Sequence, residues 1–285
     1  MNQTKRILVT GSNKGIGYAI VDLILQRTSY NVVMAVRSEE RGQQAIKTLV
    51  EKNPGSESRL SLKLLDLLKP DEFDAFYQSL GGPVDALVNN ASLLEYRDRE
   101  TPEGTVNQIQ ANLINTIKLT EDMLTGGHIN QNGKVVHVTS GWGNTSYIKD
   151  LNPEVYKRIN DEVESLDLKE LHQMIETFRV EATNPETRKK YPMIYQSTKM
   201  FMNAYSFIRA RTQDIREKGI QMYSVTPGFC HTDMTQQLRD NGMMPSRTNY
   251  DGGEDVFYLV NLPYEFDEKY QGQHFAQKEV SSFRN

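Results

Sequence analysis

The fold of this chain is decided by the stretch Lys5-Arg6-Ile7-Leu8-Val9-Thr10-Gly11-Ser12-Asn13-Lys14-Gly15-Ile16-Gly17. Its first half is an apolar run typical of a buried β-strand, and its second half is a glycine-rich turn. Apolar side chains then recur at helical spacing, at Ile16, Ala19, Ile20, Leu23 and Ile24. The stretch therefore predicts a strand, a glycine turn and a helix in direct succession, although a glycine cluster after a strand can also be only a tight turn.

A glycine turn between a strand and a helix suits the pyrophosphate of a dinucleotide. Glycines let the backbone approach the phosphates, and the helix N-terminus offers free N–H groups and a positive dipole end. A second predicted strand, 31–36, ends at Arg37, which lies 20 positions after Gly17, where such folds meet the adenosine ribose. An arginine there suits the 2′-phosphate of NADP, and we expect Arg41 and Lys14 to add positive charge. The alternative for Arg37 is a solvated residue at a strand end.

A second motif, Tyr195-Gln196-Ser197-Thr198-Lys199, lies about 55 residues after the serine that ends the apolar run Val135-Val136-His137-Val138-Thr139-Ser140. Side chains four apart share one face of a helix, so the Lys199 charge is predicted to stabilise a tyrosinate at Tyr195 and lower its pKa. Such a phenol is a proton donor near neutral pH. A tyrosine and a solvated lysine on one helix surface are the alternative interpretation.

Further strands are predicted at 59–66, 85–90, 133–140, 219–226 and 273–275, and they alternate with helical patterns. This alternation predicts an α/β fold with a doubly wound parallel sheet of Rossmann type and an active site at the carboxyl ends of the strands. Asn90, Ser140 and Pro227 all fall at such ends.

Taken together, these residues resemble the short-chain dehydrogenase/reductase family, and more narrowly its carbonyl reductases. The resemblance extends over nearly the whole chain. It implies a cofactor site formed by Gly11, Ser12, Asn13, Lys14, Gly15, Ile16, Gly17, Arg37, Arg41, Asp66, Leu67, Asn90, Tyr195, Lys199, Pro227, Gly228 and Thr232. Two positions depart from the family pattern: Ser92 replaces the glycine after Asn-Asn-Ala, and Asn115 lies where a small residue commonly follows the helix asparagine, Asn112.

The resemblance also implies a mechanism. NADPH delivers hydride to a carbonyl carbon, Ser140 binds the carbonyl oxygen, and Tyr195 gives that oxygen a proton. Lys199 holds the nicotinamide ribose and lowers the Tyr195 pKa, and Asn112 helps to place a water that relays protons. The expected substrate pocket comprises Ser140, Trp142, Tyr195, Phe229 and Met234; for Trp142, Phe229 and Met234, core packing is the alternative.

The segment 144–192 is expected to be a helical insertion before the catalytic tyrosine. It contains an amphipathic stripe that requires cover, formed by Leu168, Leu171, Met174, Ile175 and Phe178. Carbonyl reductases of the family carry a similar insertion over helices that other members use to dimerise, which implies a monomer. The alternative position is a lid over the substrate cleft.

Composition is consistent with one NADP-binding domain over 1–285. With 38% hydrophobic residues the chain can bury a large core, and a formal net charge of −4 gives no basic footprint for nucleic acid. The start of the chain has no signal-peptide core and no apolar run reaches membrane-spanning length, so we expect a cytoplasmic protein without a membrane partner. The histidines have no metal-ligand spacing, and the single cysteine, Cys230, is expected to be a packed thiol.

Three other functions use similar sequence features. The same residues would serve NADP-dependent oxidation of a secondary alcohol, and a non-catalytic NADP sensor would need only the cofactor residues. A nucleotide-sugar epimerase is disfavoured by the glycine spacing and by the short stretch after Thr232.

Overall fold

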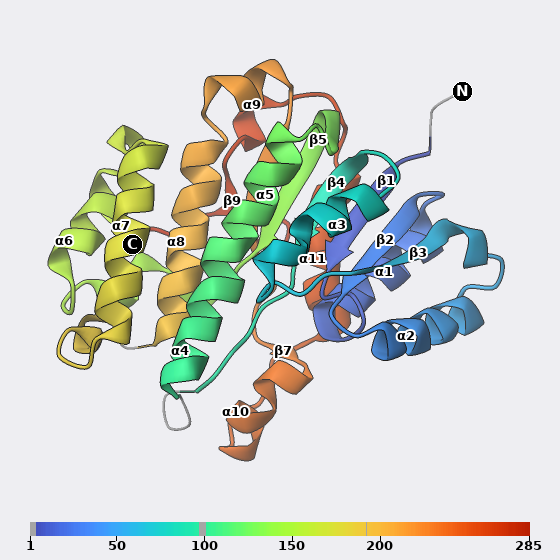
Figure 1. Ribbon diagram of the computed structural model, residues 1–285. Coiled ribbons are helices and arrows are strands. Elements are labelled where there is room, and N and C mark those ends of the chain that lie inside the picture. Colours follow the sequence, from blue (N-terminus) through green and yellow to red (C-terminus); the bar gives the residue numbers. More distant parts are fainter. Residues whose placement is uncertain (1–3, 97–100, 192) are drawn as a thin grey trace.

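The computed structural model describes residues 4–96, 101–191 and 193–285 (Figure 1). Within these ranges, eight strands form one sheet in the order β10-β9-β6-β5-β4-β1-β2-β3. The strands are β1 (Arg6–Thr10), β2 (Asn31–Val36), β3 (Leu60–Leu64), β4 (Val84–Asn89), β5 (Ile129–Val138), β6 (Gln221–Thr226), β9 (His274–Ala276) and β10 (Glu279–Ser281). Every neighbouring pair is parallel except β9 and β10. The predicted doubly wound parallel sheet is confirmed, apart from the antiparallel strand β10.

Helices cover both faces of this sheet (Figure 1). They are α1 (Gly15–Arg27), α2 (Glu39–Lys52), α3 (Phe73–Ser79), α4 (Pro102–Ile109), α5 (Asn115–Thr125), α6 (Pro153–Tyr156), α7 (Leu168–Thr183), α8 (Ile194–Arg209), α9 (Gln213–Glu217), α10 (Gln236–Asp240) and α11 (Asn249–Asn261). In the part of the chain that the structure describes, no helix is long and apolar enough to cross a membrane.

The apolar strand runs exist because the central strands are buried on both faces. Along β1, Leu8 packs into one core with α3, α4, α5, α7 and α8, whereas Ile7 and Val9 pack into a second core with α1, α2 and α11. All three side chains are fully buried. Successive strand residues point to opposite faces, so a strand between two helical layers needs apolar residues at consecutive positions.

The strand boundaries differ from the sequence-based ones. β3 ends at Leu64 rather than at Asp66, and β5 begins at Ile129, with an irregularity in its pairing with β4. Two features were not predicted: the antiparallel strand β10 and the small parallel pair of β7 (Cys230–His231) and β8 (Arg247–Thr248). Strands of two or three residues carry too little periodicity to be detected in a sequence.

The insertion expected at 144–192 consists of short helical turns, α6 and the long helix α7. Its last residue, Pro192, lies outside the described residues, as do 1–3 of the predicted 1–285 domain. α7 begins at a capping box, in which Asp167 accepts from the Glu170 backbone N–H and the Glu170 side chain accepts from the Asp167 N–H. Both contacts satisfy helix-end donors.

The predicted apolar stripe of α7 is buried. Leu171, Ile175 and Phe178 are at most 5% exposed, and Leu168 and Met174 pack beside them. α7 lies against α4 and α8, beside the sheet (Figure 1). The insertion thus covers helices of its own chain.

We predict that Phe178→Ala will destabilise the protein by about 3–5 kcal/mol, because it opens a cavity in the core. The Phe178 ring lies 4.8 Å from that of Tyr191 and 5.2 Å from that of Phe201, between ring centroids. Urea unfolding measures the change. Val180→Ala, on the exposed face of α7, is the control, with an expected effect within about 0.5 kcal/mol. A loss for Phe178→Ala as small as that of the control would contradict the packing described.

Candidate active site

The glycine turn after β1 is shaped by backbone requirements. Gly11 and Gly15 have φ values of +64° and +59°, in the left-handed region that favours glycine. At Gly17 a Cβ atom would lie 2.4 Å from the Gly11 carbonyl oxygen and 2.5 Å from Nδ2 of Asn90. A side chain at position 17 would therefore push apart the turn and the end of β4.

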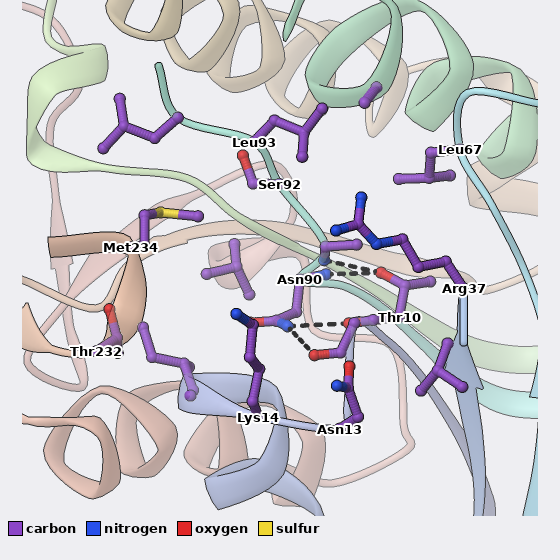
Figure 2. A pocket seen from close by; sticks show the side chains of 18 of the residues that line it. Thr10, Asn13, Lys14, Arg37, Leu67, Asn90, Ser92, Leu93, Thr232 and Met234 are labelled. Atoms are coloured by element: carbon purple, nitrogen blue, oxygen red, sulfur yellow. Dashed lines mark hydrogen bonds between the residues drawn. The ribbon is translucent and has the colours of Figure 1, made fainter. Parts of the chain in front are cut away.

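Asn90 ties the end of β4 to this turn. Its Nδ2 donates to the Thr10 carbonyl at 2.9 Å and to the Gly11 carbonyl at 3.3 Å, and its backbone N–H donates to Thr10 Oγ1 at 3.0 Å (Figure 2). β1 and β4 are neighbours in the sheet. The turn is consequently bound to both β1 and β4.

A cavity of about 380 Å³ lies at the carboxyl edge of the sheet, above this turn. Most of the predicted site residues line it: Gly11, Asn13, Lys14, Gly15, Ile16, Arg37, Asp66, Leu67, Asn90, Tyr195, Lys199, Pro227, Thr232 and Met234. Other predicted residues do not: Ser12, Gly17, Arg41, Asn112, Ser140, Trp142, Gly228 and Phe229. Several wall residues were not predicted from the sequence, among them Leu93, Leu94 and Asp233. The only sequence feature that indicates them is their position after a strand end or after the Pro-Gly motif.

Of the three basic residues expected near the cofactor phosphate, Arg37 and Lys14 line the cavity and Arg41 does not. Arg37 is exposed and lines the cavity (Figure 2), and no ion pair holds its side chain within the described residues. Lys14 instead pairs with Asp233, with Nζ 2.9 Å from Oδ2. Arg41 lies in the first turn of α2, off the cavity. Only Arg37 offers an unpaired guanidinium to a ligand here.

Tyr195 and Lys199 lie on α8 and are both buried at the cavity wall. The Tyr195 hydroxyl hydrogen-bonds with the side chain of Ser140, which follows β5. Lys199 Nζ donates to the Val138 carbonyl at 3.0 Å and lies 5.5 Å from the centroid of the Tyr195 ring. The Trp142 ring packs edge-on against that of Tyr195 at 6.3 Å. The structure therefore gathers the three predicted catalytic groups Ser140, Tyr195 and Lys199.

The chain is similar to several known proteins. The model of the family described as short chain dehydrogenase matches residues 5–151. Carbonyl reductase [NADPH] 3 of Rattus norvegicus is 30% identical over 99% of this chain and 100% of its own length. Carbonyl reductase [NADPH] 1 of Sus scrofa is 29% identical over 98% of this chain and 94% of its own. The chain belongs to the short-chain dehydrogenase family. It is a carbonyl reductase-like member.

The fold of this family member agrees with a solved structure. Salutaridine reductase from Papaver somniferum superposes with a TM-score of 0.75 over 95% of this chain and 99% of its own, at 19% sequence identity. At a sequence identity of 19%, this similarity shows a shared fold and no more.

Asn112 and Asn115 each bind the backbone of a residue in the cavity wall. Asn112 lies in η3, one π-helical turn (Gln110–Ile114) between α4 and α5. Its side chain accepts from the Leu93 N–H and donates to the Leu93 carbonyl, both at 2.7 Å. Asn115 donates to the Leu67 carbonyl at 2.6 Å. Both amide atoms of Asn112 bind Leu93, so the side chain tethers this part of the cavity wall. Its expected role in placing a water stays a prediction.

The electrostatics of the buried pair differ from the expectation. Burial raises the pKa of Tyr195 well above its ordinary value, and the hydrogen bond from Ser140 opposes that rise. Burial lowers the pKa of Lys199 to about 7. Lys199 was expected to lower the Tyr195 pKa, but the net shift is upward, because loss of solvent penalises the charged form of both groups. Ser140 is the neighbour that favours the tyrosinate.

Cys230 is a packed thiol, as expected. It is buried, its Sγ donates to the Pro227 carbonyl at 3.1 Å, and burial raises the pKa of its thiol to about 11. The thiol therefore stays protonated at neutral pH and is a poor nucleophile.

We predict that the Nζ group of Lys199 titrates near pH 7, because burial disfavours its ammonium form. It should be charged below that pH and neutral above it. Nitrogen-15 NMR of lysine side chains measures the midpoint, and Lys199→Met assigns the resonance. Lys134→Met identifies the other buried lysine, whose pKa burial also lowers to about 7. A Lys199 midpoint near the ordinary lysine value of about 10.4 would contradict this environment.

Proposed function

We propose that this protein is an NADPH-dependent reductase that converts the carbonyl group of a small molecule, an aldehyde, ketone or quinone, into an alcohol. One observation carries the proposal: Ser140, Tyr195 and Lys199 meet beside a cavity that is also lined by the glycine turn and Arg37. The relatives named NADPH carbonyl reductases, which match over nearly the full length, support it.

The cavity fits a dinucleotide in its polar groups. Gly11 and Gly15 line the cavity without a side chain, so a ligand can approach the backbone of the turn at these two positions. Ser92, which replaces the family's usual glycine, lines the cavity, and its buried hydroxyl has no hydrogen-bond partner in the described structure. In this proposal Ser92 donates to the ligand, and Arg37 binds the 2′-phosphate. When bound, NADPH supplies the hydride.

In the proposed mechanism each buried residue has a separate role. Ser140 hydrogen-bonds the substrate carbonyl oxygen as negative charge develops on it. Tyr195 donates the proton, and its raised pKa keeps the phenol protonated until that charge appears. Lys199 holds the nicotinamide ribose, and its low pKa allows proton exchange at neutral pH. Asn112 holds the cavity wall through Leu93.

The proposed substrate pocket lies around Ser140 and Tyr195. Trp142 packs against the Tyr195 ring, and Met234 lines the cavity. The Met234 carbonyl accepts from the Tyr96 hydroxyl at 2.8 Å, which joins the segment after β4 to the segment after β7. Phe229 is half-buried outside the cavity lining. Met234 is therefore the best-supported apolar wall, and Trp142 is supported by its contact with Tyr195.

We predict a preference for NADPH over NADH that depends on Arg37. Arg37→Asp should erode or reverse the preference, because it removes a charge-assisted contact of about 1.5–3 kcal/mol. Catalytic efficiency with each cofactor measures it. Arg41→Asp is the matched comparison and should have the smaller effect, because Arg41 does not line the cavity. Equal efficiency of the unmodified protein with both cofactors would refute the preference.

We also predict that Tyr195→Phe lowers turnover by at least ~100-fold while NADPH binding stays nearly intact, because only the proton donor is removed. Turnover is followed by NADPH absorbance with a panel of aldehydes, ketones and quinones. Tyr30→Phe, whose hydroxyl contacts Asn261 away from the cavity, is the matched control. If Tyr195→Phe turns over normally, another group is the acid. NADPH binding without turnover by the unmodified protein would favour a sensor.

We further propose that residues 1–285 form one domain and that the protein is a monomer. The support is that α7 packs on α4 and α8, the helices on which family members usually associate, and that β10 pairs along the edge of β9. Sedimentation at micromolar concentration should give 32.6 kDa. A stable tetramer would show that these surfaces remain available. A cytoplasmic location stays a prediction from the sequence.

A further inference from the structure

The segment after β6 forms one wall of the cavity and has little regular structure of its own. Pro227 and Thr232 line the cavity, and between them lie Gly228, with φ of +76°, and the two-residue strand β7. A strand this short contributes few backbone hydrogen bonds. Side chains must therefore fix this wall.

Thr235 and Arg239 hold the Thr232 end of this wall. Arg247, on β8, links its Pro227 end to α11. Its Nη1 donates to the Pro227 carbonyl at 3.0 Å and to Asp255 Oδ2 at 2.6 Å, and its Nη2 donates to the Asp251 carbonyl at 2.8 Å. Its backbone N–H donates to the Phe229 carbonyl at 3.2 Å. One planar guanidinium thus joins the loop to α11, which a lysine ammonium cannot reproduce with the same geometry.

Close packing of Arg247 against Gly228 adds to these hydrogen bonds. A Cβ atom at Gly228 would lie 2.8 Å from Cδ of Arg247, so the arginine stem fills the space beside that glycine. The Pro227 carbonyl also accepts from Cys230, and both donors hold it on the side of α11. Arg247 itself does not line the cavity, so it acts on a ligand through Pro227.

We propose that Arg247, anchored by Asp255, is a positioning residue that fixes the first part of this wall, at Pro227 and Phe229, for binding of the nicotinamide cofactor. The inference rests on the proposed function, because it assumes that this cavity holds NADPH. Asp255 is 1% exposed, so removing Arg247 alone leaves a buried charge without its partner and destabilises the fold. Stability and positioning must therefore be tested separately.

The experiment uses the double variant Arg247→Met, Asp255→Leu, which removes both charges and keeps apolar volume. Its urea midpoint should recover toward the unmodified protein relative to Arg247→Met alone, since an apolar pair avoids the unpaired charge. Its NADPH dissociation constant, from fluorescence titration, should still rise about tenfold, because the tether on Pro227 is lost. Hydrogen exchange of the backbone amides 228–232 should accelerate without any cofactor.

The matched control is Arg216→Met, Glu268→Leu, an exposed ion pair away from the cavity, which should alter neither affinity nor exchange at 228–232. A stable double variant at positions 247 and 255 with unchanged NADPH affinity and unchanged exchange overturns the proposal. If the unmodified protein fails to bind NADPH, the proposed function and the cofactor part of this inference fall together, whereas faster exchange at 228–232 still supports a loop-fixing role for Arg247.

Discussion

The arrangement of the site depends on the hydrogen bonds between Asn90 and the end of β1. They join two neighbouring strands at the sheet edge where the cavity opens, and they place Asn90 Nδ2 against Gly17. The start of α1 thereby lies close to β1, and its residues Gly15 and Ile16 line the cavity. The turn is also bound to β2, because the Gly11 N–H donates to the Ala35 carbonyl at 2.8 Å. Thr10 is part of the link to Asn90, since its hydroxyl accepts the backbone N–H groups of both Asn90 and Ala91.

Burial governs the chemistry at the other end of the cavity. A tyrosinate and an ammonium are each costly in a buried site, so burial raises the pKa of Tyr195 and lowers that of Lys199 to about 7. At neutral pH the phenol therefore keeps its proton, and Lys199 lies close to the midpoint of its titration. In that state the hydrogen bond from Ser140 is the local interaction that favours a negative oxygen, and it is directed to the hydroxyl that we propose as the proton donor. Such a site responds strongly to a new negative charge, because little solvent screens it.

Sequence patterns predicted what depends on local repetition and on spacing. The predictions of the strand runs and of the glycine turn were correct. Burial between two helical layers requires consecutive apolar residues, and close backbone contact requires glycines, so both can be recognised in the sequence. The grouping of Ser140 with Tyr195 and Lys199 followed from family spacing. The pairing of Lys14 with Asp233 could not be predicted, because it depends on a fold that brings residues 219 positions apart together. Likewise, the side-chain amide of Asn112 hydrogen-bonds with the backbone of Leu93. A sequence pattern does not indicate which hydrogen-bond partner a buried amide has.

The stretch between Ser140 and Tyr195 is more than added surface, because residues 283–285 bind it to α8, the helix that carries Tyr195 and Lys199. The Thr145 N–H donates to the Phe283 carbonyl at 3.0 Å, and the Phe283 ring is buried against Phe207 of α8 at 6.2 Å. Nearby, the Asn285 N–H donates to Asn160 in the insertion at 2.7 Å. α8 is consequently packed between the sheet, α7 and this tail. Tyr195 and Lys199 must hold their positions against Ser140 to within fractions of an ångström to act together, and a helix fixed on several sides meets that requirement.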